Sequence, residues 1–163
     1  MAFLLDANAF IEAKKRYYAF DICPGYWEFL DRQSIAGTIV SIEAIRDEIF
    51  ERDDDLAAWA RMRGDLFPGA TPEVLPHLQT LAAWVQRQQY RPAAVAEFLN
   101  SGDYFLIASA MASGHTVVTL EVPDPAAKKR VKIPEPCVAH SVPFISPFVM
   151  LRRLGARFVS PNP

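Results

Sequence analysis

The chain has 163 residues, of which 51% are hydrophobic and 22% are charged, and its formal net charge is −2. This composition is typical of a globular protein with its own hydrophobic core, and it excludes a disordered or low-complexity chain. The small net charge excludes a general attraction to nucleic acid, so a polyanion would have to be held by local basic clusters. We therefore expect a single domain over residues 1–163.

The two cysteines of the chain, Cys23 and Cys137, do not stand in a spacing typical of a zinc site. We expect neither such a site nor a disulfide framework, which fits a reduced cytoplasmic compartment. The sequence shows no cationic leader before a cleavable apolar stretch, and no run reaches the roughly 18 apolar residues that a membrane span requires. We therefore expect a cytoplasmic protein that makes no contact with a membrane.

The N-terminal part of the chain predicts strands that alternate with helices. A short continuous apolar run is typical of a strand buried on both faces, whereas apolar residues three or four positions apart indicate a helix. By these criteria we predict strands at 2–6 and 38–41, and helices at 7–18, 24–33 and 41–51.

The rest of the chain continues this alternation after a long helical stretch. Residues 53–100 have helical patterns broken by prolines, and they predict a helical insertion between the second and third strands. An apolar helix and a third strand follow, and then a loop rich in Pro, Lys and Arg. We predict this helix at 101–114, the strand at 115–121, the loop at 122–136, and a last helix at 146–155 flanked by short edge strands at 137–140 and 156–159. Such an order implies an α/β fold, a three-layer α/β/α sandwich with a central, mostly parallel sheet.

Acidic residues stand where the predicted strands end. Asp6 ends the first strand, Glu121 follows the third, and Asp103 opens the helix that leads into the third strand. In an open parallel sheet the functional crevice lies beyond the carboxyl ends of the strands, so these three side chains are expected to face one crevice. A carboxylate taken out of water needs a partner, and Asp6 at the end of a buried strand is the clearest case.

A fourth acid comes from the helix at 41–51. Glu48 falls at the edge of the apolar stripe that includes Ile45, whereas Glu43 and Asp47 project on the other side. Glu48 is therefore the better inward candidate, with Asp47 or Glu43 as the alternatives. Carboxylates that share a cleft repel one another, and Mg²⁺ or Mn²⁺ relieves this repulsion because both prefer oxygen ligands. Such ions support phosphodiester hydrolysis, which is the chemistry that we expect.

The stretches LLDANAF, SIEAIRDEI, SGDYFLIASAMASG and HTVVTLE resemble the four-part pattern of PIN-domain nucleases. With RYYAFDICPGYWEFL, the chain resembles a less-characterised bacterial PIN-like branch. The resemblance to VapC-type toxins implies a Mg²⁺- or Mn²⁺-dependent ribonuclease, the toxin of a type II toxin–antitoxin pair, with RNA as substrate, a cognate antitoxin and a homodimer as partners. Carried over residue by residue, it implies a metal-binding and catalytic set with two supporting residues: Asp6, Glu48, Asp103 and Glu121, supported by Asn8 and Thr119.

The chain departs from that pattern in two ways. The last acid is Glu121 where many relatives have Asp, and Asp124 stands nearby as an alternative fourth acid. The helical insertion at 53–100 is also longer than in the shortest toxins. Both departures leave the choice of substrate open.

Each of these residues also has a purely structural interpretation. Asp6 or Asn8 can serve as the cap of the helix that begins near Ala7, Asp103 can favour the helix dipole from the first turn, and Thr119 can fill a strand. The scattered histidines and the tryptophans are expected to be structural, with no histidine as general base: His77, His115, His140, Trp27, Trp59 and Trp84.

Two basic runs are candidates for holding RNA phosphates, although such runs are often only solvated surface. One contains Lys14 and Arg16; the other contains Lys128, Lys129 and Arg130, and it is favoured because it follows Glu121 closely. The alternative to a nuclease is a catalytically inactive PIN-like protein-interaction module that acts through its tryptophan-bearing helical insertion.

Overall fold

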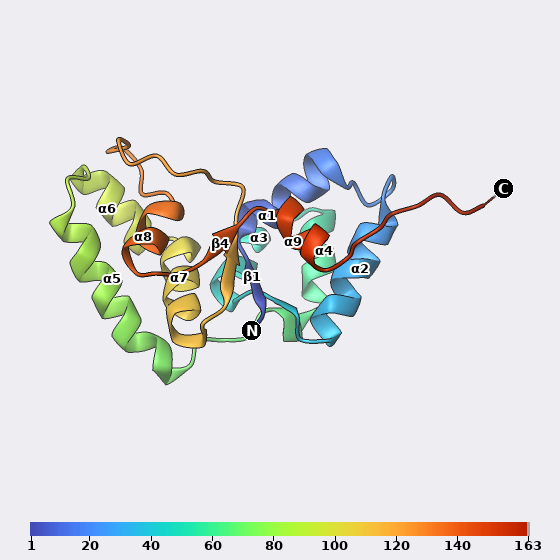
Figure 1. The fold of residues 1–163 in the computed structure, drawn as a ribbon, viewed down its shortest axis with the longest axis horizontal. Coiled ribbons are helices and arrows are strands. Elements are labelled where there is room, and N and C mark those ends of the chain that lie inside the picture. Colours follow the sequence, from blue (N-terminus) through green and yellow to red (C-terminus); the bar gives the residue numbers. More distant parts are fainter. Residues whose placement is uncertain (163) are drawn as a thin grey trace.

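A computed structural model describes residues 1–162 of the chain (Figure 1). Strands and helices alternate along it, and several helices begin at a proline, whose fixed φ and missing N–H suit the first helical turn. The elements are β1 (Phe3–Leu5), α1 (Ala7–Glu12), the π-helix η1 (Ala13–Tyr17), α2 (Pro24–Ile35), β2 (Ile39–Val40), α3 (Glu43–Phe50), α4 (Asp55–Arg61), the 3₁₀ turns η2 (Gly64–Leu66) and η3 (Pro72–Val74), α5 (Leu75–Arg87), α6 (Pro92–Leu99), α7 (Gly102–Ser113), β3 (Thr116–Val118), α8 (Pro134–Ala139), β4 (Phe144–Ile145) and α9 (Pro147–Arg153).

The four strands form one parallel sheet in the order β2-β1-β3-β4. In the central pair, Phe3 lies opposite Thr116 and Leu5 lies opposite Val118. This register brings the carboxyl ends of β1 and β3 to the same edge, so the residues that follow Leu5 and Val118 are neighbours. The predicted parallel sheet is confirmed.

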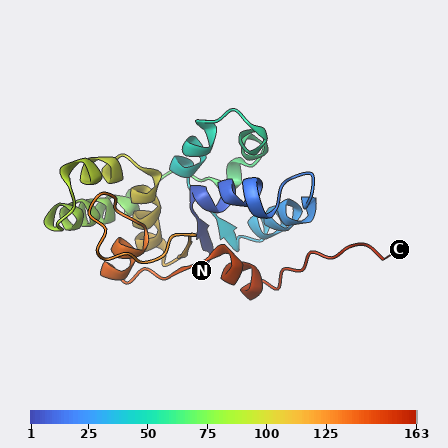
Figure 2. The ribbon, with the colours of Figure 1, turned by 90° about the horizontal axis from the view of Figure 1, so that it is seen from above.

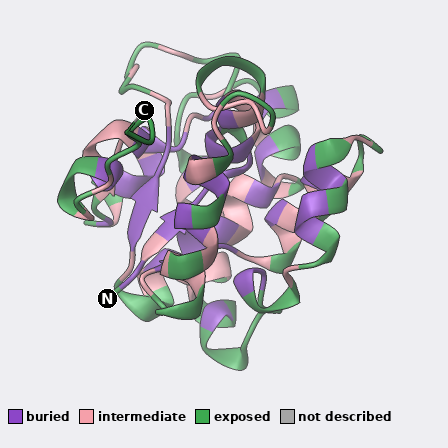
Figure 3. Ribbon diagram, turned by 90° about the vertical axis from the view of Figure 1, so that its right-hand side faces the viewer, coloured by how far each residue is buried: buried purple, intermediate pink, exposed green. Residues whose placement is uncertain are grey.

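Helices cover both faces of the sheet, which confirms the three-layer arrangement. In Figures 1 and 2, α5, α6, α7 and α8 lie on one side of the strands, and α1, α2, α4 and α9 lie on the other. Figure 3 shows the central strands largely coloured as buried; β3 is buried throughout, whereas both residues of the edge strand β4 are intermediate. The predicted helical insertion is also confirmed, because the chain between β2 and β3 contains α4, η2, η3, α5 and α6 before it reaches α7.

The two predicted edge strands after the basic loop are wrong. Residues 137–140 fall at the end of α8 instead, where Pro134 occupies the first helical position and Cys137 is buried while Val138 is exposed. The fourth strand is β4, which pairs with β3, and residues 156–159 form neither helix nor strand. Short apolar runs fit a buried helix as well as a strand, and only pairing with β3 selects the segment that joins the sheet.

Phe10 anchors the core on the α1 side of the sheet. Its side chain is fully buried, and its ring centroid lies 6.0 Å from that of Trp59 on α4 and 5.8 Å from that of Phe67. The first helix is thereby held against the start of the insertion. No helix within residues 1–162 has the length and apolar character that crossing a membrane would require.

Replacing Phe10 by Ala should lower the free energy of unfolding by about 3–5 kcal/mol, because a buried ring is lost and a cavity is left. Urea denaturation measures the change. Phe158→Ala is a matched control, since the Phe158 side chain is 37% exposed, and it should cost only about 1–2 kcal/mol because less apolar surface returns to water. Equal losses for the two variants would contradict the central position of Phe10.

Candidate metal centre

Asp6 is buried at the carboxyl end of β1, with 2% of its surface exposed. Its backbone N–H donates to the Val118 carbonyl (3.1 Å), and its carboxylate accepts from the N–H of Ala9 (2.6 Å), so Asp6 is the N-cap of α1. Burial raises the pKa of this carboxyl to about 7, against the lowering effect of hydrogen bonds from Thr119 and Ala9. Asp6 therefore does cap α1, but the hydrogen bonds that its carboxylate accepts do not offset the cost of burying its charge.

Thr119 connects the ends of the two central strands. It is buried directly after β3, and its side chain forms a hydrogen bond with Asp6. The same hydroxyl oxygen accepts from the backbone N–H of Glu121 (3.1 Å). Thr119, which was expected to support the acids, thus contacts two of them, Asp6 and Glu121.

Asp103 lies in the first turn of α7, two residues after the Ser101 cap, whose hydroxyl accepts from the N–H of Tyr104 (3.4 Å). Burial raises the pKa of the Asp103 carboxyl to about 8, and the charges of Asp6, Glu121 and Glu48 add to the rise, whereas Arg130 lowers it. Within residues 1–162 no hydrogen bond or ion pair engages this carboxylate. Asp103 and Asp6 are therefore two mutually repelling acids without a sufficient positive partner.

Glu48 faces the cleft from α3. Its Oε1 accepts from the N–H of Gly102 at the start of α7 (2.6 Å), and burial raises the pKa of this carboxyl. A Cβ at position 102 would lie 2.6 Å from the same oxygen, so only glycine allows this approach. The alternatives Glu43 and Asp47 are more than half exposed and pair with Arg46, which favours Glu48 as the inward acid.

Glu121, three residues after β3, is nearer to the other acids than Asp124, because its charge raises the pKa of both Asp6 and Asp103; like Asp6, it is not among the residues that line the cavity described below. The Glu121 side chain is 12% exposed, and its Oε1 lies 2.7 Å from Nη2 of Arg130 while its Oε2 accepts from the N–H of Ile133 (2.7 Å). Asp124 is 45% exposed and pairs with Lys132 at 3.3 Å. Glu121 is thus the more buried of the two candidates, and its role as the fourth acid stays a prediction.

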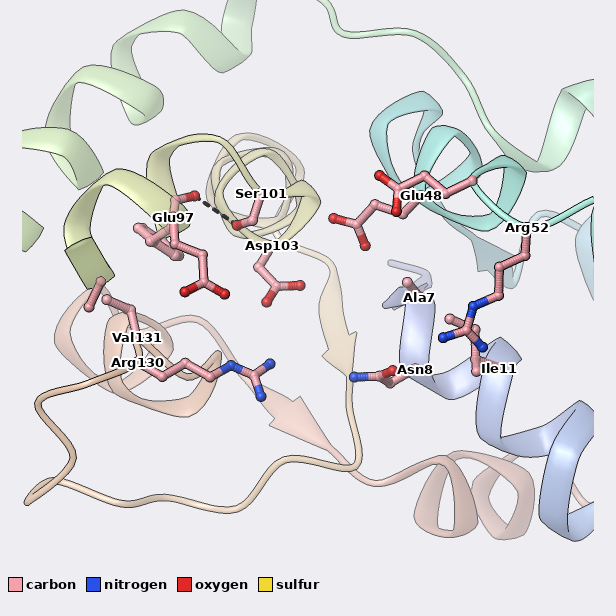
Figure 4. Close-up of a pocket in the computed structure, with 13 residues that line it drawn as sticks. Ala7, Asn8, Ile11, Glu48, Arg52, Glu97, Ser101, Asp103, Arg130 and Val131 are labelled. Atoms are coloured by element: carbon pink, nitrogen blue, oxygen red, sulfur yellow. Dashed lines mark hydrogen bonds between the residues drawn. The ribbon is translucent and has the colours of Figure 1, made fainter.

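A cavity of about 270 Å³ lies between these elements (Figure 4). Asn8, Glu48, Asp103 and Arg130 line it, and Asn8 is exposed there and is not the cap of α1. Further residues that were not expected from the sequence line the cavity, from the end of α3, from α6 and from the start of α7: Glu51, Arg52, Glu97 and Ser101.

A pattern in the sequence could have indicated one of these four cavity residues, Arg52. Arg52 stands four positions after Glu48, a spacing that predicts one shared side if the helix continues, although α3 ends at Phe50. Glu97 belongs to the insertion, and its position beside the cleft depends on how α6 packs against the rest of the fold.

No group of three or more His, Cys, Asp or Glu side chains within residues 1–162 is close enough to hold a metal ion. Two of the four predicted acids have protein partners: Glu48 accepts a hydrogen bond from the N–H of Gly102, and Glu121 forms an ion pair with Arg130. The donor chemistry nevertheless fits a hard divalent cation, because Asp6 is buried, Asp103 is half-buried, and the charge of Asp6 raises the pKa of Asp103. These two residues are the ones that fit such an ion best.

The predicted phosphate-binding residues divide into two kinds. Lys14 is held by Asp54 (3.2 Å) and Asp55 (3.1 Å), and Arg16 pairs with Glu12 (2.7 Å) within the first helical segment. The charges of this first run are thus engaged within the protein, and those of Lys14 connect η1 to the start of α4.

The second run lies on the loop beside the cleft. Lys128 and Lys129 are exposed, and the Lys128 ammonium lies 5.6 Å from the centroid of the Tyr90 ring. Arg130 reaches into the cavity from the same loop. This loop is thus better placed than Lys14 and Arg16 to meet an anion at the cleft.

The histidines and tryptophans lie outside the cavity. His115 accepts from the N–H of Ala2 (3.1 Å), and His140 packs its ring against Trp84 with a centroid distance of 5.5 Å. Trp27 and Trp59 are buried in the core, and His77 is half-buried on α5. None of these residues lines the cavity that contains Asp103.

The comparisons with known proteins identify a family and a fold. A family model described as a domain of unknown function (DUF4411) matches residues 3–158. The structure is similar to that of VapBC2 from Rickettsia felis bound to a DNA fragment from their promoter, with a TM-score of 0.57 and 10% sequence identity over 90% of this chain and 98% of that chain. This chain therefore has a PIN-like α/β/α fold, shared with the matched chain of that structure. The comparison with curated proteins finds no match.

The stability of the metal-free protein should fall as the pH rises from about 4 to about 8. The carboxyls of Asp6 and Asp103 have pKa values of about 7 and about 8 when folded, above the ordinary 3.8. The folded state then binds more protons than the unfolded state across this interval, so the free energy of unfolding decreases with pH. Urea denaturation in the presence of chelator measures this slope.

Asp103→Asn should make the slope shallower, because the amide cannot ionise. Asp47→Asn, at an exposed position, is the matched control and should keep the wild-type slope. A metal-free protein whose stability rises between about pH 5 and pH 8 would contradict the raised pKa values of these two carboxyls.

Proposed function

This chain belongs to the DUF4411 family, and we propose that it is a Mg²⁺- or Mn²⁺-dependent ribonuclease that hydrolyses RNA phosphodiester bonds. The observation that carries the proposal is the buried Asp6 and the half-buried Asp103 beyond the carboxyl ends of parallel strands. Burial raises both pKa values; the charges of Glu121 and Glu48 add to the rise at Asp6, and those of Asp6, Glu121 and Glu48 add to the rise at Asp103. Two such carboxylates create a strong local demand for positive charge. A bound divalent cation supplies that charge, lowers the pKa of water and stabilises a leaving oxygen.

Asp6 and Asp103 would hold the ion, with Glu121 and Glu48 as the further acids of the cleft. Thr119 would orient Asp6 through its hydrogen bond, and the bond from Gly102 to Glu48 would keep α7, and so Asp103, in place. These contacts act on the direction of the carboxylates and therefore on how well they match a shared ion.

Basic residues on both sides of the cleft support RNA as the substrate. Lys128 and Lys129 lie on the loop beside the cavity, and Arg52 lines it at the end of α3. No ion pair within the described residues 1–162 involves Arg52. A phosphodiester chain that crosses the acidic centre would thus meet positive charge before and after the reacting bond.

We further propose that the chain is the toxin of a type II toxin–antitoxin pair and that its cytoplasmic partner is an antitoxin protein. The support is the fold shared with VapBC2 from Rickettsia felis, a structure that contains promoter DNA. Expression of the chain in a bacterial host should therefore arrest growth, and Asp103→Asn should relieve the arrest.

Asp6→Asn and Asp103→Asn should each lower RNA cleavage by at least about a hundredfold, because each removes a negative ligand from the reacting centre. Cleavage of an unstructured RNA with MnCl₂ or MgCl₂, and with chelator, is the measurement. Asp6→Asn should still fold, since Asn caps helices as well as Asp does. Asp124→Asn is the matched control outside the cleft and should keep full activity.

Thermal melting with added Mn²⁺ separates this function from the inactive protein-interaction module. A ligand that binds only the folded state raises the melting temperature, so wild type should be stabilised and Asp103→Asn should not. Absence of both cleavage and Mn²⁺ stabilisation in the wild type would favour the interaction module.

The double variant Lys128→Gln/Lys129→Gln should weaken RNA binding and its dependence on salt. For single strands the log–log salt slope changes by about 0.7 per phosphate contact, so the loss of two contacts predicts a change of about 1.4. Filter binding at several salt concentrations, in the Asp103→Asn background to prevent cleavage, measures the slope. Lys14→Gln is the matched control, since Lys14 is engaged by Asp54 and Asp55; it should lower stability and leave RNA affinity unchanged.

A further inference from the structure

Arg130 brings a positive charge from the basic loop into the acidic cleft. It lines the same cavity as Asp103 and Glu48, and in Figure 4 its guanidinium points towards the space between the acids. Its Nη2 lies 2.7 Å from Oε1 of Glu121. Within residues 1–162, this is the one ion pair that any of the four cleft acids forms.

This contact occupies Glu121 completely. The other carboxylate oxygen accepts from the backbone N–H of Ile133 at 2.7 Å, so both oxygens of Glu121 already have a partner. The Glu121 side chain is 12% exposed and that of Arg130 is 52% exposed. The acid is therefore held beside the cleft, behind Arg130, which lines the cavity itself.

The loop that carries Arg130 is fastened on both sides of that residue. The carbonyl of Lys128 accepts from the N–H of Arg91 (2.9 Å), and Lys132 pairs with Asp124 (3.3 Å). The Arg130 side chain has Glu121 as its one side-chain partner within the described residues. Arg130 can therefore leave the cleft by a change of rotamer while the loop backbone stays in place.

We propose, on the basis of the function proposed above, that the Arg130 guanidinium is a tethered cation that competes with the divalent metal ion for Glu121. With the arginine in place, an incoming ion meets a like charge and lacks one of its carboxylates. When the arginine turns outward, Glu121 is released to join Asp6 and Asp103. The metal affinity of the cleft is thus set below what its acids alone would give.

Calorimetric titration of the full chain with MnCl₂ tests this competition. Arg130→Gln should bind Mn²⁺ about tenfold more tightly than wild type, because a repelling charge and a competitor for Glu121 are both removed. Arg130→Lys keeps the charge and should stay close to wild type. Titration at about pH 8 limits competition from protons at the carboxylates, and circular dichroism verifies that each variant is folded.

Lys132→Gln is the matched control, because it removes the same charge from the same loop but breaks a pair with Asp124 outside the cleft. Its Mn²⁺ affinity should equal that of the wild type. Tightening by Lys132→Gln as large as that by Arg130→Gln would overturn the inference, since general charge would then explain both.

The outcomes also separate this inference from the proposed function. If wild type binds Mn²⁺, Asp103→Asn does not, and Arg130→Gln binds no more tightly than wild type, the competition is refuted while the metal centre stands. If neither wild type nor Arg130→Gln binds Mn²⁺, both proposals fall. Binding by Arg130→Gln alone would support a stronger competition than we infer.

Discussion

The parallel pairing of β1 with β3 is the constraint on which the cleft depends. Because Leu5 lies opposite Val118, the next residues of the two strands, Asp6 and Thr119, come to the same edge of the sheet. The hydrogen bond from the Asp6 N–H to the Val118 carbonyl continues the ladder by one step and fixes the start of α1 there. The sheet register thus places a buried carboxylate where no side chain of the core can neutralise it.

The surrounding elements are arranged around that uncompensated charge. The first turn of α7 adds Asp103, and the bond from Gly102 to Glu48 fastens this turn to α3. A helix N-terminus favours negative charge, which offsets part of the cost of gathering acids near it. Burial and the neighbouring acids still raise the pKa of Asp103 to about 8, so the helix terminus does not offset the whole cost of the charge.

The helical insertion and the basic loop form the outer wall of the cleft. Glu97 on α6 lines the cavity, and the N–H of Arg91 just before α6 holds the loop through the Lys128 carbonyl. The insertion therefore determines where Arg130 enters the cleft. A protein with this fold but a shorter insertion would retain the acids at the sheet edge and lack this wall of the cavity.

The sequence by itself determined the fold class, and it predicted that Asp6 and Asp103 stand near each other at the carboxyl edge of the sheet. Both follow from local patterns: buried strands appear as continuous apolar runs, and an acid at the end of such a run is conspicuous. The sequence also indicated Glu48 over its neighbours, because helical periodicity alone orients that side chain.

Only the tertiary structure decided which partner each polar group has. Glu121 and Asp124 are three positions apart in the sequence, yet one pairs with Arg130 in the cleft and the other with Lys132 outside it. The apolar run at 137–140 became the end of α8 because β4 took the edge beside β3. Ion pairs and strand pairing join residues that are distant in sequence, so no local pattern specifies them, and they are fixed only when the whole chain packs.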